Sequence, residues 1–311
     1  MERYKCSIAL SKENVNLESN IDLYPHFNQD RIIREHINFT ASPHLVDTQF
    51  RIFYQNDEDE NLEYDANEAY ISCPWHKVHN GNTIIYASYP FIELQRQLRG
   101  YITSHCSVVD WQGRGIVLFG NPGAGKTSVT IDLCLRYGAR LIGNDISIIG
   151  LRRNGPHARS GAKSLILRYE SIRRNLPNIL KFFPKDPLDK WQYKIRIDPA
   201  DLGLKMSNDE VPINKAFVVH VDYSMKDVFI EAGCNIIMRL LLNENFSRYI
   251  RGTCISVLAG ENLDSLGYIP SYDSKELYEF REELIKAIIA KLCYISGPMD
   301  AISDFIVSSV N

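Results

Sequence analysis

The sequence predicts an α/β fold with a mixed sheet, in which a P-loop domain follows a small β-rich domain. Residues 120–127, GNPGAGKT, lie between the apolar strand pattern GIVLF and the helical pattern SVTIDLCLRYG. A second β-like run, CSVVD, and the turn WQGRG come just before that strand, so we expect an antiparallel hairpin that leads into the loop. A conventional P-loop NTPase reaches its loop through a parallel crossover, and the hairpin therefore indicates a mixed sheet.

The first hundred residues alternate β-like runs with polar turns. The runs begin at Tyr4, Phe50, Ala69 and Thr83. From Pro90 onward the pattern changes, because apolar residues recur at helical spacing behind a proline in the first turn, at Phe91, Leu94, Leu98 and Ile102. We therefore expect a β-rich N-terminal domain over residues 1–89, which selects a substrate or partner, and a P-loop domain over residues 90–311.

Acidic residues gather between two of the N-terminal runs, in the segment 57–65, DEDENLEYD. We interpret this segment as a solvated hairpin tip, and a metal site is the alternative. Beyond the loop helix we expect strands at RLIGND, ISIIGL and AFVVHV. A long helix near the C-terminus carries one apolar stripe that we assign to core packing, namely Leu277, Phe280, Leu284, Ile288 and Leu292.

The composition is that of a globular protein. The chain has 311 residues, 45% of them hydrophobic and 23% charged, and a net charge of −3, which argues against general nucleic-acid binding. Seven scattered cysteines form no CxxC pair, so buried free thiols are expected. The N-terminus lacks the apolar core of a signal peptide, and no apolar run is long enough to cross a membrane, which predicts a cytoplasmic protein.

The motif GNPGAGKT predicts that the chain binds a nucleoside triphosphate with Mg²⁺. Its glycines let backbone N–H groups turn toward phosphate oxygens, Lys126 reaches the β- and γ-phosphates, and Thr127 offers its hydroxyl to magnesium. ATP is the expected nucleotide, and GTP stays open. The residues expected to contact it are Gly120, Asn121, Pro122, Gly123, Ala124, Gly125, Lys126, Thr127 and Ser128.

Two further residues are candidates for the chemistry. Asp145 ends the strand that follows the loop helix, where a carboxylate beside the P-loop strand would bind magnesium; capping of a turn is the alternative. His105 begins the strand that pairs with the P-loop strand, and a structural role is as compatible with its position as a catalytic one.

Residues 105–145, from HCSVVDWQGRG to GARLIGND, resemble the core of the HPr kinase/phosphorylase family, whose nucleotide-binding fold is shared with phosphoenolpyruvate carboxykinase. The segments G-A-K at Gly161 and K-W-Q-Y-K at Lys190 are similar to stretches in stand-alone HPr-kinase-like proteins, some of which modify peptide precursors such as those of lasso peptides. The resemblance implies that Asp145 binds metal or activates the accepting hydroxyl, and that His105 is an active-site histidine that stabilises charge at the γ-phosphate.

The chain departs from this family at two positions. Asn144 stands where typical HPr kinases have the first of two consecutive acids, and Ser128 stands where they have an acid after the P-loop hydroxyl residue. Fewer acids bring the number of metal ions and a reverse phosphorylase reaction into question. The N-terminal region shows no sign of recognising HPr itself.

The segment 151–174 is the most basic of the chain, with one acid, Glu170, among seven cations: Arg152, Arg153, Arg159, Lys163, Arg168, Arg173 and Arg174. Such a segment would hold an anionic substrate or the triphosphate; a solvated loop is the alternative. Arg159 and Lys163, close to Gly161, are the predicted substrate contacts. In the C-terminal part, Arg248 and Arg251 are candidates for contact with the γ-phosphate.

The sequence thus predicts a kinase that transfers the γ-phosphoryl group of ATP to a hydroxyl of a peptide, a protein or a small molecule. The alternative is a nucleotide-binding regulatory module with at most slow hydrolysis, which Asn144 favours. Carboxykinase chemistry is a third, weaker alternative, because a dedicated second-metal set of lysine, histidine and acid is not evident. No nucleic-acid or membrane partner is expected, and a homo-oligomer stays open.

Overall fold

The computed structural model describes residues 3–184, 187, 189–252, 256–260, 262 and 264–310. The chain forms two compact units, Met1–Thr103 with Phe246–Arg281 and Ser104–Asn245 with Glu282–Asn311. This division differs from the predicted domains 1–89 and 90–311. The predicted boundary falls inside helix α4 (Thr83–Leu98), and a C-terminal segment returns to the first unit.

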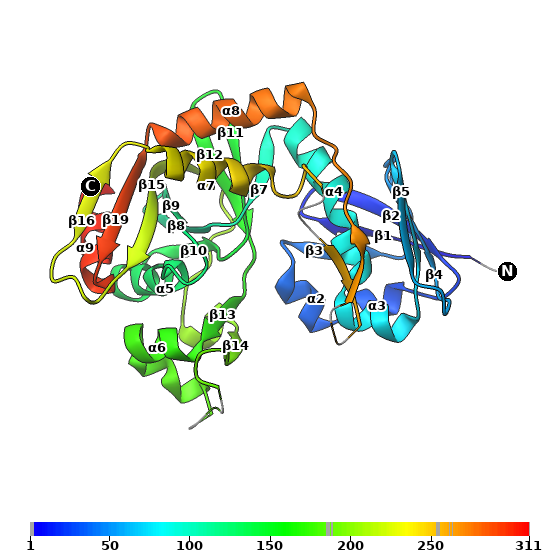
Figure 1. Ribbon diagram of the computed structural model, residues 1–311, viewed down its shortest axis with the longest axis horizontal. Coiled ribbons are helices and arrows are strands. Elements are labelled where there is room, and N and C mark those ends of the chain that lie inside the picture. Colours follow the sequence, from blue (N-terminus) through cyan, green and yellow to red (C-terminus); the bar gives the residue numbers. More distant parts are fainter. Residues whose placement is uncertain are drawn as a thin grey trace. The chain divides into compact units, whose positions relative to one another are not determined.

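The first unit is built on a six-stranded mixed sheet in the order β3-β1-β2-β4-β6-β5 (Figure 1). β1 and β2 form an antiparallel hairpin, β2, β4 and β6 are parallel to one another, and β5 returns antiparallel to β6. The elements of this unit before α4 are β1 (Tyr4–Leu10), β2 (Glu13–Ser19), α1 (Tyr24–Phe27), α2 (Asp30–Glu35), β3 (Phe39–Ser42), β4 (Arg51–Gln55), β5 (Asn61–Asp65), β6 (Glu68–Ser72) and α3 (Trp75–Gly81).

Three of the four predicted N-terminal strands are confirmed as β1, β4 and β6, but the run at Thr83 is wrong, because it begins α4. β-branched residues favour strands in isolation, yet almost every residue of this helix is buried, and packing outweighs propensity. The predicted start at Pro90 is also wrong, since Pro90 lies inside α4. Phe91 is fully buried and stacks on Phe50, with ring centroids 5.2 Å apart.

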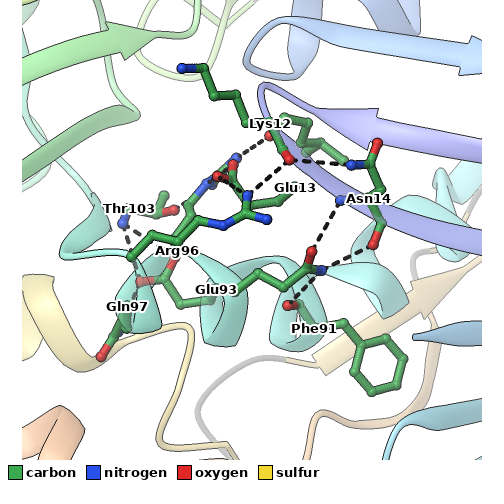
Figure 2. Close-up of polar contacts among 11 residues, drawn as sticks. Lys12, Glu13, Asn14, Phe91, Glu93, Arg96, Gln97 and Thr103 are labelled. Atoms are coloured by element: carbon green, nitrogen blue, oxygen red, sulfur yellow. Dashed lines mark hydrogen bonds and ion pairs between the residues drawn. The ribbon is translucent and has the colours of Figure 1, made fainter. Parts of the chain in front are cut away.

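A buried polar network ties α4 to the rest of the first unit (Figure 2). Arg96 donates to Glu13 Oε2 at 3.0 Å, to Thr103 Oγ1 at 2.6 Å and to the Leu10 carbonyl at 2.8 Å, and neither side chain of the Glu13–Arg96 ion pair is exposed. One turn earlier, the Glu93 carboxylate accepts from Thr103 N at 3.2 Å, and burial raises its pKa. These bonds hold the chain just before it enters the second unit.

The remaining elements of the first unit are β7 (Tyr101–Ser104), whose last residue already belongs to the second unit, and the two-stranded sheet of β17 (Ser256–Ala259) and β18 (Asp264–Tyr268). The acidic segment 57–65 is a short exposed turn followed by β5. Four buried cysteines are free thiols, as predicted, namely Cys6, Cys73, Cys106 and Cys134; Cys234 and Cys293 are free and partly exposed, and Cys254 lies outside the described residues.

The second unit has a mixed sheet, as predicted from the hairpin before the loop. Its strands follow the order β10-β8-β9-β15-β12-β11, and β19 and β16 extend it beside β15. β8 and β9 are antiparallel, whereas β15 is parallel to both β9 and β19. The strands are β8 (Ser107–Trp111), β9 (Arg114–Phe119), β10 (Arg140–Gly143), β11 (Ser147–Arg152), β12 (Gly155–Gly161), β15 (Val211–Val221), β16 (Phe229–Ala232) and β19 (Leu292–Gly297).

Helix α5 (Lys126–Tyr137) follows β9 and ends at Gly138 as predicted, with Gly138 in the left-handed conformation. It packs on α9 (Met299–Val310). A small group of elements lies beyond β12, namely β13 (Leu165–Arg168), α6 (Tyr169–Asn175), the 3₁₀ turns Pro177–Phe182 and Pro199–Leu202, and β14 (Lys194–Ile197) (Figure 1). Helices α7 (Ile236–Ser247) and α8 (Lys275–Ile289) each continue from one unit into the other.

Within the described part of the chain, no helix is long and apolar enough to span a bilayer.

Candidate nucleotide-binding site

A cleft of about 400 Å³ lies within the second unit, at the end of β9 and the start of α5. The strand, loop and helix stand in the order that the GNPGAGKT motif requires. Most of the residues predicted to contact the nucleotide line the cleft, namely Pro122, Gly123, Gly125, Lys126, Thr127 and Ser128. Gly120, Asn121 and Ala124 are not among the lining residues, and Ala124 N donates to the Asn121 carbonyl at 3.1 Å in the turn of the loop.

Lys126 lies within its own loop. Its ammonium donates to the Gly120 carbonyl at 2.7 Å and to the Asn121 carbonyl at 3.3 Å, and burial lowers its pKa while the charge of Asp145 opposes that change. Gly125 must be a glycine here: its φ is +94°, and a Cβ would lie 2.3 Å from Val221 Cγ2. The end of β15, at Val221, therefore packs so closely against the loop that only glycine fits at position 125.

Asn144 is a buried polar residue that lines the cleft. Its amide oxygen accepts from Thr127 Oγ1 at 3.1 Å and from Ser107 Oγ at 3.0 Å, and its Nδ2 donates to the Ser164 carbonyl at 3.4 Å. The Thr127 hydroxyl therefore donates its proton to Asn144, and the lone pairs of its oxygen can bind a ligand. The direct partner of Thr127 is thus Asn144, and sequence reasoning treated this residue only as a missing acid.

The backbone around Asn144 explains the G-A-K segment at Gly161. A Cβ on Gly161 would lie 2.3 Å from Gly143 Cα, so the backbone segments at positions 143 and 161 can come this close only because both residues are glycines. The approach allows Asn144 N to donate to the Ala162 carbonyl at 3.0 Å. Residues 161–164 therefore accept hydrogen bonds from both the backbone N–H and the side-chain amide of Asn144.

Asp145 and His105 meet at the edge of the cleft, which both line. His105 Nε2 lies 3.3 Å from Asp145 Oδ1, and both side chains are partly exposed. Asp145 has a φ of +69° and sits at the centre of a three-residue turn closed by Ile146 N and the Asn144 carbonyl at 2.8 Å. A non-glycine residue in this conformation is strained, and such strain is concentrated at functional sites.

The strand before Asp145 is not adjacent to the P-loop strand, contrary to our prediction, because β8 lies between β10 and β9. Asp145 still reaches the cleft because it lies beyond the end of β10, in the turn that carries Asn144 to Thr127.

The predicted substrate residues do not line the cleft. Arg159 lies on β12 and Lys163 just after it, where the Lys163 ammonium donates to Asn208 Oδ1. Arg248 and Arg251 belong to the first compact unit.

Other cations line the cleft instead, namely Arg168, Arg174 and Lys194. Arg168 and Lys194 face each other in the β13–β14 pair. The alternation of LILR, with Leu165 and Leu167 buried and Ile166 and Arg168 exposed, was the sequence signal for Arg168. Trp191, in the K-W-Q-Y-K segment, and Tyr223 also line the cleft and were not predicted.

The oxygen donors of the cleft fit a magnesium ion. Among the described residues no three His, Cys, Asp or Glu side chains gather as a metal cage. Magnesium in nucleotide sites is held by one or two protein oxygens together with the phosphates, and the Thr127 hydroxyl and the Asp145 carboxylate both line the cleft.

No protein-family model and no curated protein sequence matches the chain. Among solved structures, the chain is similar to the HPr(Ser) kinase/phosphatase from Coxiella burnetii, with 13% sequence identity over 59% of this chain and 88% of that chain, and a TM-score of 0.24. A likeness of that size carries no argument about function. The sheets and helices described above define the class directly: an α/β protein with mixed sheets and a cleft at the GNPGAGKT loop.

Proposed function

We propose that this protein is an ATP-dependent phosphotransferase that moves the γ-phosphoryl group to a hydroxyl. One observation carries the proposal: a single cleft brings together Lys126 and Thr127 of the GNPGAGKT loop with the His105–Asp145 pair. A phosphate-binding loop alone is common to motors, switches and kinases. A carboxylate held by a histidine beside that loop adds a group that can receive a proton from an accepting hydroxyl.

The roles of the residues follow from their positions. The loop amides and the Lys126 ammonium would bind the β- and γ-phosphates. Asp145 would coordinate the metal or accept the proton of the accepting hydroxyl, and His105, at 3.3 Å, would hold Asp145 and neutralise charge that develops on the transferred group. A bound Mg²⁺ held by Thr127 and Asp145 would neutralise phosphate charge.

The acceptor in this proposal is a serine or threonine of a peptide or protein, or a small-molecule alcohol, met in the cytoplasm where ATP and magnesium are supplied. Support for a relationship to HPr kinases comes from residues 105–145, because the histidine, the hairpin and the early acid all belong to that resemblance. GTP would bind the same loop, since the motif contacts only phosphates.

A second candidate is a nucleotide-binding regulatory module with at most slow hydrolysis. The observation that favours it is the neutral Asn144, which occupies the buried position bonded to Thr127. The site then has one carboxylate fewer near a metal, and binding without transfer would be the result.

Mass spectrometry separates the two candidates. A lysate incubated with ATP labelled at the γ-phosphate, with and without the protein, is searched for new phosphorylated species. The phosphotransferase gives a labelled peptide, protein or metabolite that Lys126→Ala does not produce. Label found only in inorganic phosphate would exclude the phosphotransferase and leave the regulatory module.

A further inference from the structure

The β13–β14 pair and the turn before it form a second wall of the cleft that the proposed chemistry does not use. Three residues of this part line the cleft together with the loop, namely Arg168, Trp191 and Lys194. In the proposed function, Lys126 and Thr127 bind the phosphates, and His105 and Asp145 act on the reacting hydroxyl. A ribose and a base also need surfaces, and this wall is where the cleft offers them.

Trp191 is the exposed tryptophan of the described chain. It is 62% exposed, whereas Trp111 is 7% exposed and Trp75 packs against His26, with ring centroids 4.6 Å apart. Tryptophan is usually well buried, and an exposed indole at a cleft marks a surface kept for a ligand. Tyr223, the other aromatic residue of the cleft, has its phenol hydrogen-bonded by the backbone of Met299.

Hydrogen bonds connect Trp191 to the loop through the intervening elements. Asn175 Nδ2 on α6 donates to Ser128 Oγ at 2.9 Å, which fixes α6 beside the start of α5. At the other end of α6, Tyr169 N donates to the Tyr193 carbonyl at 3.0 Å. The turn that carries Trp191 is closed by Asp189, whose Oδ1 accepts from Trp191 N at 2.9 Å. These bonds set the backbone of the turn that carries Trp191 relative to the phosphate loop.

Two cations on the same wall face each other without an acidic partner. Arg168 and Lys194 are directly opposite in the antiparallel register of β13 and β14, where like charges repel. No ion pair among the described residues includes Arg168 or Lys194, and Glu170, an acid that lines the same cleft, pairs with Arg173. A bound anion between them would relieve this repulsion, and a phosphate is the anion that the neighbouring loop already attracts.

We infer, on the basis of the proposed function, that Trp191 stacks on the nucleobase of the bound nucleotide and that Arg168 and Lys194 bind the phosphate nearest the ribose. The β13–β14 wall thereby distinguishes a nucleotide from a bare polyphosphate. Aromatic stacking accepts any base, so the wall selects nucleotides as a class.

The test compares ADP with inorganic tripolyphosphate, both with Mg²⁺, by intrinsic fluorescence and by isothermal titration calorimetry. ADP should quench the tryptophan fluorescence of the wild type, and tripolyphosphate should bind without that quenching. Trp191→Ala should lose the quenching and bind ADP about tenfold more weakly, with its affinity for tripolyphosphate unchanged. Trp75→Phe, a matched control, should retain the quenching. Arg168→Gln with Lys194→Gln should weaken ADP binding.

Two results would overturn the inference. Wild-type ADP affinity in Trp191→Ala, or in the double glutamine variant, would show that the wall does not hold the nucleotide, while nucleotide binding and the proposed function would stand. Failure of the wild type to bind both ADP and tripolyphosphate would remove the proposed function and the inference together.

Discussion

The Thr127 hydroxyl donates to the Asn144 amide oxygen at 3.1 Å, and the Asn144 amide nitrogen donates in turn to the Ser164 carbonyl at 3.4 Å. An aspartate at position 144 would accept the first bond but would turn its second oxygen toward a carbonyl. The surroundings of position 144 therefore suit an amide, and the neutral residue is matched to its site.

Asn144→Asp tests this match. Because the new carboxylate would face the Ser164 carbonyl in a buried site, the free energy of unfolding should fall by about 1–3 kcal/mol at pH 7. Protonation would restore a donor, so the loss should shrink at pH 5. Urea unfolding at the two pH values, with Ser107→Ala as the control, measures both effects. A variant as stable as the wild type at pH 7 would show that the site does not select the amide.

Gly125→Ala should destabilise the second unit more than a matched glycine does. Its Cβ would lie 2.3 Å from Val221 Cγ2, whereas a Cβ on Gly138, which also has positive φ, meets open space. We expect losses of about 2–3 kcal/mol for Gly125→Ala and about 1 kcal/mol for Gly138→Ala. Chemical denaturation gives both numbers, and equal losses would mean that β15 does not constrain the loop.

His105→Gln should separate chemistry from binding. The side chain lies 3.3 Å from Asp145, and the loop lysine is held by the Gly120 and Asn121 carbonyls, so nucleotide affinity should stay near that of the wild type. Loss of a group that supports proton transfer should lower kcat about 100-fold. Calorimetry and steady-state kinetics with an identified acceptor give the two values. A change in affinity alone would assign His105 to nucleotide binding.

The effect of Glu93→Gln on the free energy of unfolding should depend on pH. Burial raises the pKa of Glu93, so the folded protein binds a proton more tightly than the unfolded chain, whose glutamates titrate near about 4.3. Wild-type stability from this group must then fall as the pH rises above that value. The free energy of unfolding of Glu93→Gln relative to the wild type should therefore increase from pH 4 to pH 7. A difference that stays constant would contradict the raised pKa.

Local signals predicted much of the second unit. The hairpin, the loop, α5 and the strand before Asp145 all lie within 41 residues, from His105 to Asp145, where apolar periodicity and glycine punctuation specify each element. The Asp145 and His105 candidates follow from the same short stretch. Most of this part of the site is therefore formed by residues that are close together in the sequence.

The features that the sequence did not predict depend on packing between residues that are distant in the chain. Residues 83–89 look like a strand, but they are helical because nearly all of their side chains are buried. Residues 246–281, which include Arg248 and Arg251, return to the first unit, and no local pattern in the sequence indicates such a return. Arg168, Trp191 and Lys194 reach the cleft only because β13 and β14 pair across the intervening helix and turns.

The most direct test of the central claim follows the fate of γ-labelled phosphate. Wild type, Lys126→Ala and Asp145→Ala are incubated with labelled ATP, magnesium and the acceptor found in the lysate screen, and the folding of each variant is checked by circular dichroism. The wild type should move the label to the acceptor, and both folded variants should fail to do so. Transfer at the wild-type rate by either variant would contradict the assignment of this cleft as a phosphotransfer site.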